Sequence, residues 1–144
     1  MCDYSLAGVH TRLAAAGDQL TVYRFPSGSL GMVSARRRLR EILFPSLTIA
    51  ICIPPGARLL LERIPAALQH QLGISATEEV IFTQRTWEAY VHRDSVRFAN
   101  GCEVSLQQLR SGQRATVLST LPEESADTRQ SGWEHLEPII SARR

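Results

Sequence analysis

The amino-acid sequence predicts a mainly β fold: a small β-barrel or sandwich with one or two short helices. Two observations carry this prediction. Several short segments rich in β-branched and aromatic residues follow one another closely, and turns containing Gly, Pro, Ser or Asn separate them. The 144 residues are 44% hydrophobic and 21% charged, which is typical of one soluble globular domain whose core is large enough to be stable without disulfides or a metal.

Four strands are predicted in the first half of the chain. They are residues 20–25, 30–33, 47–53 and 58–64. The third of these reads LTIAICI, an apolar run rich in β-branched residues, so we expect a strand that is buried on both faces.

A helix is predicted between the second and third strands, in the segment ARRRLREILF. Ser34 can cap its start and Pro45 ends it. Leu39, Ile42 and Leu43 fall at helical spacing, so we expect these three side chains to face the core while the arginines mostly face solvent.

The second half is expected to contain a short helix, two single strands and a hairpin. Pro65 opens the helix at residues 65–72 and Gly73 follows its end, which is the usual asymmetry of helix termini. The strands are residues 78–84 and 114–118, and the hairpin joins residues 90–98 to residues 102–109.

The loop length of that hairpin decides where one cysteine points. A two-residue Asn-Gly turn would place apolar side chains opposite polar ones on both faces, which a half-buried sheet does not accept. A three-residue loop instead pairs Phe98 with Cys102 and Val96 with Val104, with Gly101 in a left-handed conformation. We therefore expect Cys102 on the core face, where a free thiol behaves as a small hydrophobic group.

The composition divides the chain at about residue 121. Residues 1–121 are predicted to form a single β-rich domain, and residues 122–144 a flexible C-terminal tail, because EESADTRQSG is polar and without periodicity. Trp133 and the stretch HLEPII interrupt that polarity. A buried tail and a short partner-binding motif both explain them, and the sequence leaves the choice open.

The three cysteines and the N-terminal sequence indicate a cytoplasmic protein. An odd cysteine number with no CxxC pair argues against a disulfide framework and for a reducing compartment. The start lacks a basic segment followed by an apolar run, so no signal peptide is expected. The longest apolar stretch, residues 47–55, is too short to span a bilayer. No membrane association is therefore predicted.

A metal site could be assembled from Cys2, Cys52, Cys102 and His10, but these residues lack the short fixed spacing of metal-binding motifs. We therefore expect no metal and no cofactor. Cys2 alone suggests different chemistry. Once Met1 is removed, the free α-amine could act as the base for the thiol of the same residue. The hypothesis of a cysteine-dependent enzyme rests on this residue.

The opening MCDYSL resembles the class II glutamine amidotransferases, which open Met-Cys-Gly. The resemblance implies a nucleophilic role for Cys2. Asp3 departs from the family pattern, because that family has glycine at the third position.

Four arginines in the predicted first helix, Arg36, Arg37, Arg38 and Arg40, are the candidate binding residues. They could contact a nucleic-acid backbone or an acidic partner protein. Nucleic acid is disfavoured because aromatic residues make up 6% of the chain and the net charge is +2, well below the usual basic footprint. The leading hypothesis is a non-catalytic module that binds or regulates a protein partner.

Three stretches look familiar together: MCDYSL, RFPSGSLG, and VRFANGCEV followed by LRSGQRATVL. They resemble a group of small bacterial proteins without an assigned activity, and the likeness extends to about Leu121. It implies a bacterial source and one shared domain. Separately, LRSGQRATVL is similar to the turn and strand of SH3-like barrels of the ferrous-iron-transport A type.

Overall fold

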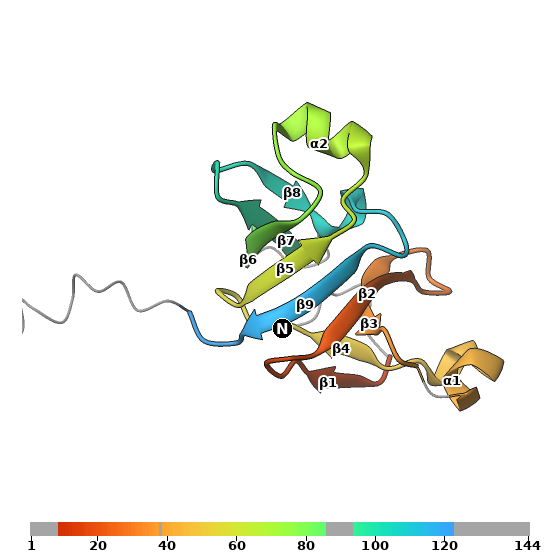
Figure 1. Cartoon of the computed structure of the whole chain (residues 1–144). Coiled ribbons are helices and arrows are strands. Elements are labelled where there is room, and N and C mark those ends of the chain that lie inside the picture. The colour runs from red at the N-terminus through yellow and green to blue at the C-terminus, as the bar shows by residue number, and fades with distance from the viewer. Residues whose placement is uncertain (1–8, 38, 86–93, 123–144) are drawn as a thin grey trace, which may run out of the picture.

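A computed structural model describes residues 9–37, 39–85 and 94–122 of the chain (Figure 1). Strands dominate it, which confirms the mainly β prediction. In chain order the elements are β1 (Thr11–Leu13), β2 (Gln19–Arg24), β3 (Leu30–Ser34), α1 (Leu39–Leu43), the 3-10 helix η2 (Pro45–Leu47), β4 (Ala50–Cys52), β5 (Arg58–Glu62), α2 (Ala66–Leu72), β6 (Glu78–Gln84), β7 (Asp94–Phe98), β8 (Glu103–Ser105), the 3-10 helix η3 (Leu106–Gln108) and β9 (Arg114–Ser119).

The described strands form one seven-stranded antiparallel sheet and one parallel pair. The sheet has the order β3-β2-β9-β5-β6-β7-β8, and the pair is β1 with β4. The last strand, β9, lies in the middle of the sheet, where it pairs Ala115 with Leu20 of β2 and with Leu61 of β5. The sheet is therefore complete only when a distant part of the chain joins two earlier strands, an arrangement rich in non-local contacts.

The core lies on one face of the curved sheet. Alternate side chains of the central strands point into it, as the period of a strand requires; among them are Leu20, Val22, Leu59, Leu61, Val80, Phe82, Val96 and Val117, each at most 2% exposed. All three residues of β4 are buried, but the strand predicted at 47–53 is shorter than expected, because Leu47 ends the 3-10 helix η2 and Ile49 is 37% exposed. The pairing of β4 with β1 is a feature that the sequence did not indicate.

The hairpin of β7 and β8 has the predicted three-residue loop. Val96 pairs with Val104, the amide of Phe98 donates to the carbonyl of Cys102 at 2.8 Å, and Gly101 has a φ of +86°. Cys102 is half-buried and packs against the core. The register argument therefore located this thiol correctly.

A glutamine side chain joins the two edges of the sheet. Gln107 of η3 follows β8, and its Oε1 accepts from the amide of Leu30 at 3.0 Å while its Nε2 donates to the carbonyl of Leu30 at 2.9 Å. The amide group thus pairs with the edge strand β3 as a neighbouring strand would. No strand ladder joins β3 to β8 in the described part of the chain, so a closed barrel is not found.

The second predicted helix is confirmed and the first is partly wrong. Helix α2 ends at Leu72, and Gly73 follows in the left-handed conformation at φ +67°. Helix α1 has five residues, and none of them is buried. The expectation that Leu39, Ile42 and Leu43 face the core is therefore wrong.

The strands on either side of α1 explain this exposure. β3 and β4 pack directly against each other, and Val33 and Ala50 are fully buried there. Pro45 also forces the preceding Phe44 into an extended conformation, with φ −125° and ψ +86°. The helix ends after little more than one turn and projects from the body of the domain (Figure 1).

Cys2, Arg38 and the predicted tail beyond Pro122 lie outside the described residues. In the part of the chain that is described, no helix is long and apolar enough to cross a membrane.

Candidate functional site

Helix α1 carries an exposed apolar cluster. Leu39 is 70% exposed, Ile42 54%, Leu43 63% and Phe44 60%. Large apolar side chains that gather on a surface, unlike single ones, mark a site of interaction. We call these four side chains, together with Arg36, Arg37 and Arg40, the α1 surface.

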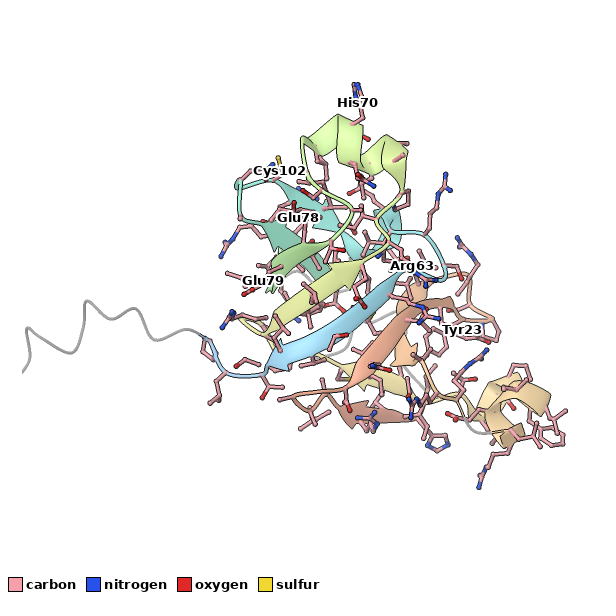
Figure 2. All side chains as sticks on the ribbon, in the orientation of Figure 1. Tyr23, Arg63, His70, Glu78, Glu79 and Cys102 are labelled. Atoms are coloured by element: carbon pink, nitrogen blue, oxygen red, sulfur yellow. The ribbon has the colours of Figure 1, made fainter. Side chains whose placement is uncertain are left out.

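The base of the α1 surface is fixed to the sheet. The amide of Ala35 donates to the carbonyl of Gln19 at 2.8 Å, and the hydroxyl of Ser34 accepts from the amide of Arg36 at 3.3 Å. The guanidinium of Arg37 lies over the ring of Tyr23, 4.7 Å from its centre, an attractive contact between a cation and an aromatic face. Tyr23 is labelled in Figure 2, close to the base of α1.

The far end of the helix is tied back to β4. Oε1 of Glu41 accepts from the amide of Ile49 at 3.3 Å, and the 3-10 helix η2 packs beside α1. The acidic side chain of the helix is thus turned toward the returning chain. The apolar side chains are left to solvent on a support that is held at both ends.

The α1 surface is strongly positive. Residues 34–44 contain four arginines and one glutamate, a net charge of +3. Arg36 and Arg40 are exposed and Arg37 is half-buried, so the structure brings three of the four predicted arginines together with the apolar cluster.

An acidic side chain beside Arg36 belongs to another ion pair. Asp18 lines the same shallow hollow as Arg36, but its carboxylate binds Arg12 Nη1 at 2.9 Å and the amide of Ala15 at 2.9 Å. Desolvation raises the pKa of Asp18, but the hydrogen bonds from Arg12 and Ala15 outweigh it, so the pKa is lowered. Asp18 therefore stays ionised and is engaged by Arg12.

The other sequence-predicted residues do not assemble into a site. Cys102 packs against the core, and His10 is exposed. Cys52 is buried and disulfide-bonded, so the expectation of reduced cysteines, drawn from their odd number and the lack of a CxxC pair, is wrong for this residue. Because a bonded sulfur has no thiolate to offer, Cys52 is unavailable as a ligand. Within the described ranges, no three His, Cys, Asp or Glu side chains gather as metal ligands would. The nucleophile hypothesis concerns Cys2, which lies outside the residues that the structure describes.

Two hollows elsewhere in the described structure have weaker chemistry. One of about 290 Å³ lies on the sheet between Arg58, Glu79 and Arg97, but Arg58 Nε donates to Glu79 at 2.6 Å, so these two charges satisfy each other. The second, near Cys52 and Asp94, has a volume of about 10 Å³. A space of that size holds at most one water molecule and no substrate.

Sequence reasoning missed Phe44 and the exposure of its neighbours. The signal available was Pro45, because the residue before a proline avoids helical geometry. A predicted helix that stops so early has too few turns to cover a core.

No protein-family model, no curated protein and no solved structure matches this chain. The α1 surface must therefore be interpreted from its own chemistry.

Proposed function

We propose that this protein is a non-catalytic module that binds a protein partner through the α1 surface. One observation supports this proposal above the others: four large apolar side chains stand more than half exposed beside three arginines. Protein interfaces combine an apolar, aromatic-containing centre with arginine, which is one of the residues enriched in their hot spots.

The apolar cluster favours a protein over a nucleic acid. A nucleic-acid surface made from arginines would pair them with aromatic platforms for bases or with polar groups for phosphates. Leu39, Ile42 and Leu43 offer neither, and only Phe44 among the four apolar side chains of the α1 surface has a ring on which a base could stack. Their exposure has a cost in water that burial against apolar side chains of a partner would remove.

A membrane surface fits less well for reasons of size. Five residues rise about 7.5 Å along a helix axis, and amphipathic helices that lie in bilayer interfaces are usually much longer.

The chemistry of the α1 surface specifies the partner. Its net charge of +3 over residues 34–44 selects acidic side chains, and Arg36 and Arg40 can each bind a carboxylate through two parallel hydrogen bonds. The partner segment thus combines carboxylates with two or more large apolar side chains. The resemblance of residues 109–118 to SH3-like barrels concerns the scaffold that carries this surface. That the domain is such a small barrel stays a prediction.

Photo-crosslinking from the α1 surface tests this function. A photoreactive phenylalanine analogue at position 44 should capture a specific protein in the cells that produce this chain. The captured protein is then identified, purified and titrated against the parent chain. Phe44→Ser should weaken that binding by about tenfold or more, as expected for a central interface residue.

Leu13 provides the matched control, because it is 75% exposed and lies on β1, outside the α1 surface. The analogue at position 13 should not capture the same protein, and Leu13→Ser should bind it with unchanged affinity. The proposal fails if Phe44→Ser binds like the parent. It also fails if Phe44-dependent binding is found only with anionic phosphatidylglycerol vesicles, or if a single-stranded oligonucleotide binds and loses affinity in Arg36→Ala.

A further inference from the structure

The chain beyond the described domain carries the chemistry that the α1 surface selects. Its large apolar residues lie within eight positions of one another: Trp133, Leu136, Ile139 and Ile140. Residues 123–144 contain five acidic residues and three arginines, a net charge of −2; residues 123–140, before the two terminal arginines, carry −4, against +3 for residues 34–44. Two of those acids, Glu134 and Glu137, lie between the apolar residues.

The described chain ends at a fixed point, far from α1. A Cβ atom built on Gly56 would come within 2.9 Å of Pro122, so Pro122 lies directly over the turn that precedes β5. Figure 1 shows β9 leading to this end of the chain on one side of the domain and α1 projecting from the opposite side.

The reach of the linker decides which copy of α1 the segment can contact. Ten residues separate Pro122 from Trp133, and at full extension they cover roughly 35 Å. A globular domain of this size has a radius of gyration of about 13 Å, so the path half-way around its surface is roughly 50 Å. Trp133, the largest apolar residue of the segment, therefore cannot follow that path to α1 of its own molecule.

We infer that the segment 133–140 of one molecule binds the α1 surface of a second copy, in a reciprocal exchange that makes a two-fold dimer. The inference rests on the proposed function and names one occupant of that surface. Trp133 and its apolar neighbours cover Leu39, Leu43 and Phe44, while Glu134 and Glu137 approach the arginines. The same contact means that an outside partner must displace the segment before it can bind.

Mixing two defective variants tests the exchange. Phe44→Ser removes the surface but keeps the segment, and Trp133→Ser does the reverse. In sedimentation velocity from about 1 μM to about 1 mM, the parent should form dimers and each variant alone should stay monomeric. An equimolar mixture should recover a heterodimer through one intact contact, with an affinity below that of the doubly bonded parent.

Thr128→Ala, in the linker, and Leu13→Ser, on β1, are the matched controls and should dimerise like the parent. A monomeric parent at the highest concentration overturns the inference, and so does a mixture that stays monomeric. Dimers that persist in both defective variants also overturn the inference, because such dimers must form through another surface. If the parent is monomeric but a crosslinked partner still depends on Phe44, the exchange is wrong and the proposed function stands.

Discussion

The two helices of this domain have similar sequence patterns and opposite environments. Both are short, and both carry leucines at helical spacing. Neither helix has a buried residue, but in α2 Leu68 and Leu72 are half-buried against the core, whereas in α1 Leu39 and Leu43 are 70% and 63% exposed. The comparison shows that an apolar stripe on a helix predicts a face that binds other apolar groups. Whether these groups belong to the core or to another molecule depends on the rest of the fold.

The contacts at the helix ends account for the difference. Nε2 of Gln69 donates to the carbonyl of Ile64 at 2.7 Å, and Asn100 in the hairpin loop donates to the carbonyl of Leu72 at 2.9 Å. These bonds tie α2 to the residues that follow β5 and to the hairpin loop. The described ties of α1 and of the residues before it lead to Gln19 and Tyr23 of β2 and to Ile49, just before β4. They hold the helix without turning its apolar side inward.

The largest contrast should come from two phenylalanines. Phe82 is 2% exposed in the core, so Phe82→Ala should lower the free energy of unfolding by about 3–5 kcal/mol through lost burial and a cavity. Phe44→Ala should change it by less than about 0.5 kcal/mol, because the side chain already lies in water. Urea unfolding followed by circular dichroism measures both. A loss of several kcal/mol in Phe44→Ala would mean that α1 is packed after all.

The second contrast compares a leucine in each helix. Leu72→Ala removes a half-buried side chain and should cost about 1–2 kcal/mol. Leu43→Ala, at the last position of α1, should be close to neutral in the same urea titration. Equal costs for the two variants would remove the distinction between a packed and an unpacked helix.

The sequence predicted this fold as far as local patterns reach. Strand β6 was predicted at residues 78–84 and has those bounds, and the hairpin register followed from which pairing keeps Val96 opposite Val104. The central place of β9 between β2 and β5 could not be predicted, because no local signal says which distant strand completes a sheet. The parallel pairing of β1 was missed for the same reason.

The sequence predicted the arginines of the candidate site as binding residues, but it did not predict that the apolar side chains beside them are exposed. Arg40 lies on the predicted helix before Pro45, whereas Arg36 and Arg37 precede α1, which begins at Leu39 and not at residue 35 as predicted. The exposure of Leu39 and Leu43 depends on β3 and β4 packing together, a tertiary feature that periodicity does not contain. A core helix and a docking helix have the same pattern until their surroundings are known.

The link between the sheet edges should have an intermediate effect. Leu30 begins β3, the strand that leads to α1. Gln107→Ala removes both hydrogen bonds to Leu30 and leaves the backbone amide and carbonyl of Leu30 without that partner. We expect a loss of about 1–3 kcal/mol in thermal or urea unfolding. Gln108→Ala gives a poor control, because Gln108 caps η3, so the exposed Arg110→Ala serves instead and should be near neutral. If Gln107→Ala is also neutral, the edge of β3 is held by packing alone.

The smallest effect concerns the charge beside α1. Because the pKa of Asp18 is lowered on folding, its ionised form stabilises the domain above the unfolded pKa near 3.8, and this stabilisation is lost as the pH falls through the lower folded value. Arg12→Ala should therefore reduce stability near neutral pH by less than about 1 kcal/mol, since Arg12 is well exposed, and should flatten the loss of stability between about pH 5 and about pH 2.

Arg36→Ala is the matched control. It should keep the parent's pH dependence in urea titrations, because Asp18 is bonded to Arg12. If Arg36→Ala flattens the curve instead, Asp18 neutralises the α1 surface, and the attraction of that surface for an acidic segment is correspondingly weaker.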